Sequence, residues 1–221
     1  MFKQKWSQQL QQMVHAIVGS GVLAASALLL SVQVASVQAA QAPAAFAMCQ
    51  SCHLEQAQGN PAVHAPALAG HEAAYLERQL RHFKTGARAA DDAIAAPMKA
   101  VVDGLSEQDI PLLTSYIASL PRQPRTPSTP DAAVKDKGYR IYIGSCGACH
   151  GGKAEGIAAL NAPALYQDSA YLKRQLELFR SGKRGFDKTD KPGRQMARMA
   201  LTLTNEADIE AVLAYIGTLQ P

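Results

Sequence analysis

The chain has 221 residues, of which 48% are hydrophobic, and a formal net charge of +4 at neutral pH. This length suits one large domain or two small ones, and the hydrophobic content is too high for a chain that is disordered throughout. The basic residues form no concentrated stretch, which argues against a nucleic-acid-binding protein.

The first 39 residues have the layout of a secretory signal peptide. Lys3 and Lys5 lie in a start segment without acidic residues, and an apolar run of mostly small residues extends from Ala16 to the sequence Val37–Ala39. A basic start, an apolar middle and a small-residue end are typical of a cleaved signal. We therefore expect cleavage after Ala39 or one residue later. An uncleaved membrane anchor is the alternative, because the run is about long enough to span a bilayer.

The rest of the chain is an internal duplication. Cys49–His53 reads Cys-Gln-Ser-Cys-His, and Cys146–His150, 97 residues later, reads Cys-Gly-Ala-Cys-His. Repetition at a fixed spacing indicates one structural unit used twice. Further pairs keep the same order at shifts of 96 to 99 residues: Pro66 with Pro163, Tyr75 with Tyr171, Phe83 with Phe179, Gly86 with Gly182, and Tyr116 with Tyr215.

Residues 121–133 are the expected linker between the repeats. Prolines occupy every third position from Pro121 to Pro130, and this spacing predicts a stiff, extended segment, because proline fixes φ and has no N–H donor. We therefore place one domain at residues 40–120 and the other at 134–221. The first carries five Lys or Arg against eight Asp or Glu, and the second thirteen against nine, an asymmetry that bears on docking rather than on fold.

Both repeats have the pattern of small, all-helical domains. Apolar residues recur at helical spacing over residues 75–85 and 171–181, and each segment meets a glycine, Gly86 or Gly182, suited to the left-handed conformation past a helix end. Ser106 and Asn205 are the expected N-caps of the last helices. No convincing run of alternating β-branched residues indicates a strand. We predict an all-α fold.

The four cysteines all lie in the two Cys-x-x-Cys-His units, which have the attachment signature of c-type haem. Two thiols three positions apart can each form a thioether with one haem vinyl group, and the adjacent histidine then places its imidazole under the iron. A structural zinc site would bring its ligand pairs closer together, a redox dithiol would need a βαβ setting, and two disulfides would not explain the histidines. We therefore expect two covalently bound haem c groups. The expected attachment and proximal residues are Cys49, Cys52, His53, Cys146, Cys149 and His150.

The distal iron ligands are inferred by elimination. The second repeat has no histidine besides His150, so its distal ligand must be a methionine, a lysine or none. Thioether sulfur is a common partner of histidine in cytochromes c and raises the reduction potential, although core packing is the commonest role of methionine. We expect Met98 in the first repeat and Met196 in the second, with Met199 as the alternative to Met196. Bis-histidine ligation stays open for the first repeat.

Pro66 and Pro163 each lie thirteen residues past the histidine of a Cys-x-x-Cys-His unit. A carbonyl group commonly orients a ligating histidine through its second ring nitrogen, so we expect that role for these two segments. An ordinary loop proline is the alternative reading.

The order of these features resembles the class I cytochromes c, and more closely the dihaem periplasmic cytochromes of the cytochrome c4 type. The resemblance covers residues 42–221 and rests on both haem-binding units, two Ala-Pro-Ala-Leu segments, two Tyr-Leu-x-Arg-Gln-Leu helices and a methionine upstream of each final helix. It implies two haem domains related by a pseudo-twofold axis, with Met98 and Met196 as distal ligands. It also implies Arg78 and Arg174 as partners of haem propionates or of the domain interface.

The resemblance further implies an electron carrier, not an enzyme, in a periplasmic respiratory chain. Its partners would be redox proteins: a quinol-oxidising complex or dehydrogenase as donor, and a terminal oxidase as acceptor. A dihaem electron-accepting subunit of a periplasmic dehydrogenase is the main alternative, and an enzyme with one open haem is a third. Membrane association is expected only through protein partners or a retained N-terminus.

One departure from the family pattern concerns the first helix. In the second repeat, Lys135–Ile143 is expected to form this helix, with Gly138 and Tyr142 crossing the last helix near Tyr215. The first repeat has only Ala40–Met48 at the same place, so its helix must be short or the signal segment must contribute to it.

Overall fold

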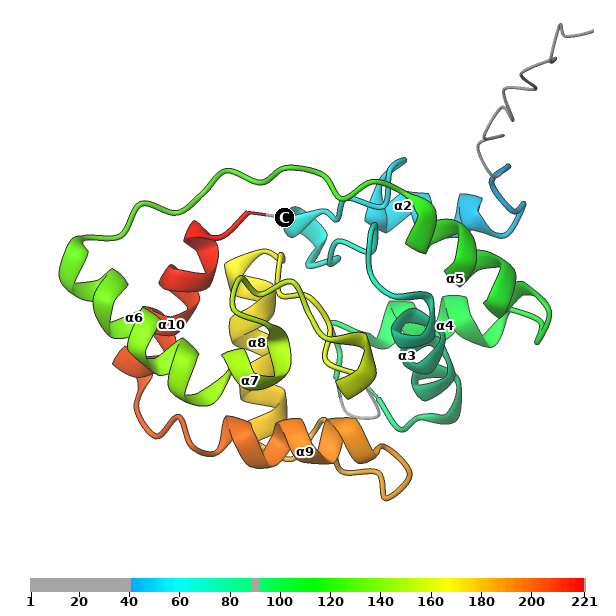
Figure 1. Cartoon of the computed structure of the whole chain (residues 1–221). Coiled ribbons are helices and arrows are strands. Elements are labelled where there is room, and N and C mark those ends of the chain that lie inside the picture. Colours follow the sequence, from blue (N-terminus) through cyan, green and yellow to red (C-terminus); the bar gives the residue numbers. More distant parts are fainter. Residues whose placement is uncertain (1–40, 89–91, 221) are drawn as a thin grey trace, which may run out of the picture. The chain divides into compact units, whose positions relative to one another are not determined.

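The computed structural model describes residues 41–88 and 92–220. The predicted signal peptide lies outside these residues. Within the described ranges the chain is helical and forms no strand, which confirms the all-α prediction (Figure 1). No helix there is long and apolar enough to cross a membrane. The α-helices of the first repeat are α2 (Phe46–His53), α3 (Ala73–Thr85), α4 (Ala96–Asp103) and α5 (Asp109–Ser119). Those of the second are α6 (Ala132–Ser145), α7 (Gly147–His150), α8 (Ser169–Arg180), α9 (Lys191–Ala200) and α10 (Glu206–Thr218).

The matched helices α3 and α8 form where the apolar spacing predicts them. The side chain of Asp168 caps α8 by accepting hydrogen bonds from the backbone N–H groups of Ala170 and Tyr171. At the other end, α3 stops at Gly86, whose φ of 77° is left-handed, and α8 is followed by Gly182 with φ 73°. Both expected glycines therefore end their helices.

The predicted caps of the last helices have different outcomes. Asn205 is the N-cap of α10, and its side-chain oxygen accepts from the N–H of Asp208 at 2.8 Å. The prediction for Ser106 is wrong in position, because α5 begins at Asp109 and Gln108 is its N-cap. Ser106 and Asp109 instead bond to each other reciprocally and close the turn that precedes the helix.

The close crossing of α6 and α10 holds the second repeat together, as expected. Gly138 packs directly on α10, and a Cβ at this position would overlap the carbonyl oxygen of Ala211. One turn further on, the ring of Tyr142 lies 5.5 Å from that of Tyr215. The first repeat has no such helix before α2 in the described residues. Instead, Phe46 at the start of α2 packs against Tyr116 of α5, with 5.0 Å between the centroids of their rings.

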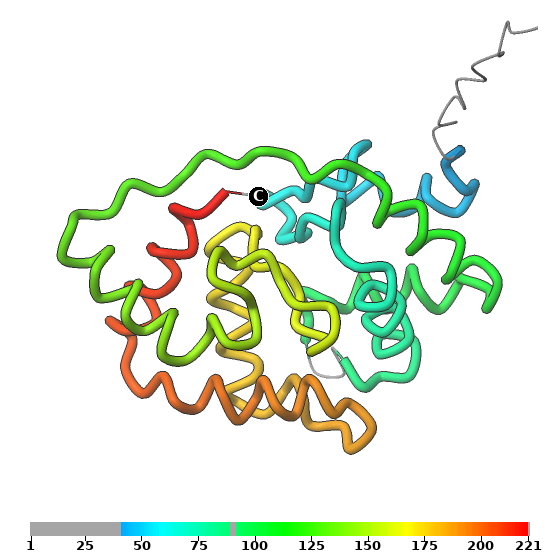
Figure 2. Tube along the Cα trace, viewed as in Figure 1, coloured from blue at the N-terminus to red at the C-terminus, as the bar shows by residue number. Residues whose placement is uncertain are grey.

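Each repeat has its own hydrophobic core. The first core contains Phe46, Leu76, Phe83, Val102, Ile110, Leu113 and Ile117. The second contains Tyr142, Tyr166, Leu172, Leu203, Ile209, Val212 and Ile216. Residues 121–131 run between α5 and α6 without regular structure (Figure 2). This segment contacts both repeats, because Arg122 donates to the carbonyl of Gly70 and the backbone N–H of Ser128 donates to that of Gly217.

Candidate functional site

The two Cys-x-x-Cys-His units lie on short helices that end in their histidines. Cys49 belongs to α2 and Cys146 immediately precedes α7, and both are half-buried. Burial raises the pKa of the Cys49 thiol, and it raises the pKa of the Cys146 thiol to about 11. Redox-active dithiols need a lowered thiol pKa, so these surroundings do not suit a redox dithiol. The four cysteines all lie within the described residues and form no disulfide.

Each histidine of these units is buried and oriented by a backbone carbonyl. His53 Nδ1 lies 2.8 Å from the carbonyl oxygen of Pro66, and His150 Nδ1 lies 2.8 Å from that of Pro163. A carbonyl can only accept, so Nδ1 carries the proton and Nε2 keeps its lone pair for a metal. Burial also lowers the pKa of both imidazoles, which favours the neutral, ligating form. The role expected for the two proline segments is confirmed.

The same turn brings each carbonyl to its histidine. Gly59 has a φ of 86°, and a Cβ there would lie 2.5 Å from the backbone nitrogen of Ala67; Gly156 has a φ of 84° and the same contact with Ala164, at 2.6 Å. Only glycine permits both this conformation and this approach of two backbone segments. The proline carbonyl can therefore reach the imidazole thirteen residues behind it.

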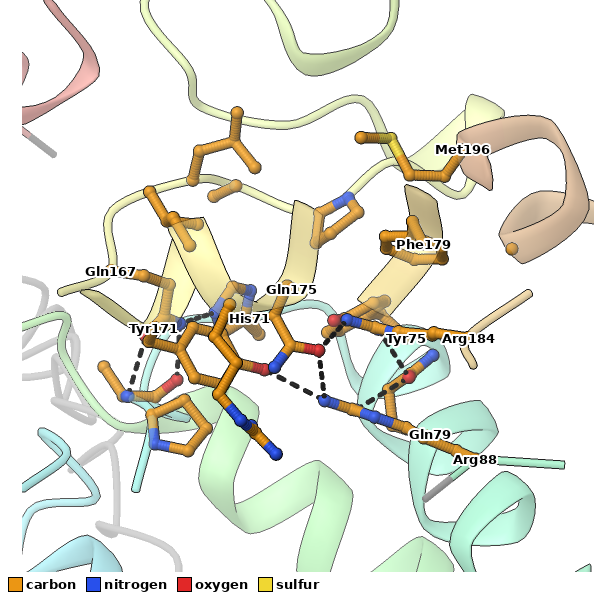
Figure 3. Close-up of a pocket in the computed structure, with 18 of the residues that line it drawn as sticks. His71, Tyr75, Gln79, Arg88, Gln167, Tyr171, Gln175, Phe179, Arg184 and Met196 are labelled. Carbon is orange, nitrogen blue, oxygen red and sulfur yellow. Dashed lines mark hydrogen bonds between the residues drawn. The ribbon is translucent and has the colours of Figure 1, made fainter. Parts of the chain in front are cut away.

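The two units face a cavity of ≈ 430 Å³ with a mainly apolar lining. Met98 of α4 and Met196 of α9 both line it, and both are half-buried. Met199 also lines the cavity but is 36% exposed. Figure 3 shows Met196 reaching from α9 towards the other lining side chains, beside Phe179. The structure thus brings both histidines and all three candidate methionines to one cavity.

A symmetric polar cluster joins the two repeats at this cavity (Figure 3). Arg88 donates to Gln79 of its own repeat at 2.9 Å and to the hydroxyl of Tyr171 in the other repeat at 3.0 Å. Arg184 donates to Gln175 of its own repeat and, at 3.1 Å, to Gln79 of the other. These two arginines were not among the residues predicted from the sequence. The signal was present, because each arginine stands two residues after a matched glycine.

Arg78 and Arg174 also make contacts between the repeats. Arg78 donates to the side-chain and backbone oxygens of Asn161 at 2.7 and 3.1 Å. Arg174 forms an ion pair with Asp92. Of the two roles that the family resemblance implies for these arginines, these contacts fit the domain interface.

The cavity suits a largely apolar group that carries carboxylates. The four arginines that line it, Arg78, Arg88, Arg174 and Arg184, outnumber its two lining acids, Asp92 and Asp190. Two buried nitrogens of lining residues, His71 Nδ1 and Arg78 Nε, have no hydrogen-bond partner among the described residues. Buried polar atoms of native proteins are normally paired, so these atoms indicate a polar ligand group. A haem has both properties: an apolar macrocycle and two propionates.

Comparison with known proteins agrees with this chemistry. The model of the cytochrome c family matches residues 39–121 and 135–220, once in each repeat. The thiosulfate dehydrogenase electron acceptor of Thiomonas intermedia (strain K12) is 32% identical over 185 residues, which cover 80% of this chain and 80% of that protein.

Two solved structures are also similar. Reduced recombinant cytochrome c4 from Pseudomonas stutzeri superposes with a TM-score of 0.64 at 28% identity, over 79% of this chain and 94% of that one. Thiosulfate dehydrogenase from Marichromatium purpuratum gives a TM-score of 0.61 at 30% identity, over 78% of this chain and 36% of that one.

The duplicated helical fold and the two Cys-x-x-Cys-His units define a dihaem c-type cytochrome, and its similarity to cytochromes c and to an electron acceptor makes it an electron carrier. The chain belongs to the cytochrome c family and is of the cytochrome c4 type. It binds haem c covalently, with Cys49/Cys52 and Cys146/Cys149 as the attachment pairs.

Proposed function

We propose that this chain is the electron acceptor of a periplasmic thiosulfate dehydrogenase and passes the electrons singly to a further redox protein. The observation that carries the proposal is the 32% identity with a thiosulfate dehydrogenase electron acceptor, which extends over both repeats. Its structural similarity to a thiosulfate dehydrogenase adds support. The signal-like layout of residues 1–39 supports the periplasmic location.

In this proposal the two haem domains span residues 40–120 and 134–221, joined by the linker 121–133. His53 and Met98 ligate one iron, and His150 and Met196 the other. When bound, the haem supplies one-electron exchange at its iron. The carbonyls of Pro66 and Pro163 hold the histidines with Nε2 towards the metal, and the apolar lining excludes water, which favours a high reduction potential.

A second candidate is a general respiratory carrier between a quinol-oxidising complex and a terminal oxidase. Similarity to cytochrome c4 over 94% of that chain favours this reading. The two candidates share the haem sites and differ only in the electron donor.

Reduction of the purified, oxidised holoprotein separates the candidates. Thiosulfate and a catalytic amount of thiosulfate dehydrogenase are added, and haem reduction is followed by visible absorption. We expect reduction of both haems only when enzyme and thiosulfate are both present. Reduction by a quinol-oxidising complex but not by active thiosulfate dehydrogenase would support the respiratory carrier instead.

A further inference from the structure

Helix α9, which carries the proposed ligand Met196, has two chemically different faces. Gly193 and Ala200 are buried on its inner side, and Met196 lines the cavity. Lys191, Arg194 and Arg198 are all exposed. These three stand at positions i, i+3 and i+7, which lie on one face of a helix. The face turned away from the cavity is therefore basic.

The loop before α9 enlarges this charge. Lys183 and Lys188 are exposed, and with the three cations of α9 they define what we call the basic face. No ion pair among residues 41–88 and 92–220 involves any of its five members. The acidic side chains of the same segment form hydrogen bonds or lie near a histidine, and they do not pair with these cations. Asp190 is buried, caps α9 and faces His82, and Asp187 accepts from Thr189.

The equivalent helix of the first repeat lacks this feature. Helix α4 carries Met98 as α9 carries Met196, but its single cation, Lys99, is paired with Asp103 at 2.8 Å. The first repeat as a whole has more acids than bases, and the second more bases than acids. The helix that carries Met196 therefore presents unpaired cations at its surface, whereas the helix that carries Met98 does not.

Exposed apolar side chains accompany the basic face. Met199 and Leu201 at the end of α9 are 36% and 59% exposed, and Phe186 in the preceding loop is 48% exposed. Apolar side chains within a polar, charged surround are typical of protein interfaces. A cluster of unpaired cations also attracts a protein of opposite charge and accelerates the encounter.

We propose that the basic face is the docking surface for an acidic patch of a protein redox partner, which thereby approaches the Met196 side of the second haem site. This inference rests on the proposed function as an electron carrier. Charge complementarity identifies the partner's chemistry, and the position of the face on the helix that carries Met196 favours a redox protein over an anionic membrane.

Binding of poly-L-glutamate to the holoprotein tests the proposal. Titration calorimetry is run at about 10 mM salt, where the Debye length is about 30 Å. The test variant is R194E/R198E. The matched control is K135E/R140E on α6, two exposed residues that take part in no ion pair of the described chain and whose reversal changes the net charge by the same amount. Far-UV circular dichroism and the haem spectrum check that both variants fold.

We expect R194E/R198E to weaken binding about tenfold and K135E/R140E to weaken it less than about twofold. In the wild-type protein, bound polyglutamate should slow amide exchange in residues 183–200. Equal weakening in both variants would show that only net charge matters and would overturn the proposal, as would no weakening in either. If R194E/R198E lost binding to phosphatidylglycerol vesicles but kept its binding to polyglutamate, the basic face would be assigned to a membrane instead. The proposed function can survive each of these failures, because thiosulfate-dependent reduction is measured separately.

Discussion

His71 and Gln167 occupy the same position in the two repeats, 96 residues apart, and hydrogen-bond to each other at the interface. Gln167 Nε2 lies 2.8 Å from His71 Nε2, and the same amide bonds both the N–H and the carbonyl of Ala67. Since the amide nitrogen can only donate, His71 must accept through Nε2 and is neutral in this arrangement. Equivalent positions of the two repeats thus carry different residues, and only one of them, His71, can take up a proton.

Stability is expected to depend on pH through His71. Its side chain is buried, and burial, with a further contribution from Arg122, lowers its pKa from 6.5 to about 4. The unfolded chain takes up a proton below pH 6.5, whereas the folded chain resists it until about pH 4. Stability is therefore complete above pH 6.5 and is lost as pH falls towards 4, by ~3 kcal/mol at most.

The variant H71Q tests this dependence, because it places in the first repeat the residue that the second repeat already has. We expect a smaller loss of unfolding free energy between pH 6.5 and 4 than in the wild-type chain, measured by guanidinium titration. H64N, at an exposed position with a φ of 56°, is the control for the loss of a histidine outside the contact with Gln167. An unchanged slope in H71Q would contradict the assignment.

Two glycines of helix α6 should respond oppositely to alanine. At Gly138 the new Cβ would overlap the carbonyl oxygen of Ala211, so G138A should lower the unfolding free energy by roughly 1–3 kcal/mol. At Gly144 nothing lies within 4 Å of the new Cβ, so G144A should raise it by about 0.5–1 kcal/mol through helix propensity. Thermal and denaturant unfolding measure both changes. Similar effects in the two variants would mean that the α6–α10 crossing is looser than described.

Replacing the proposed distal ligand should change one haem only. M196H would replace thioether by imidazole and lower the reduction potential of the second haem, because methionine ligation raises the potential. M199L should leave both potentials unchanged, since Met199 is the more exposed of the two methionines. A potentiometric titration with optical detection resolves the haems. A fall in potential for M199L instead would assign the ligand to Met199.

The ion pair between Arg174 and Asp92 should contribute more to stability than a surface pair. Their side chains are 18% and 10% exposed, so D92N leaves a largely buried guanidinium without its partner and should cost about 2–3 kcal/mol. D103N removes the partner of Lys99, whose side chain is 38% exposed, and should cost less than about 1 kcal/mol. Denaturant unfolding at two salt concentrations compares them. Equal costs would show that the pair between the repeats is solvated.

The sequence by itself determined the haem chemistry and the duplication. Two cysteines and a histidine within five residues can be recognised as a haem-attachment site without knowledge of the fold, because their spacing along the chain already brings them close together. The matched helices α3 and α8 were also predictable, since apolar spacing and a following glycine act over a few residues. The fold class followed from the same local patterns.

Only the tertiary structure decided which residues meet across the repeats. It also decided where α5 begins: Ser106 was expected to cap this helix, but the helix begins three residues later, at Asp109. Arg88 and Tyr171 contact each other across 83 residues of sequence, and the pairing of His71 with Gln167 spans 96. The exposure of Met196 and Met199, and the outward face of α9, likewise depend on the packing of distant segments. No local pattern specifies such contacts, because they form only when both repeats have folded and buried their surfaces against each other.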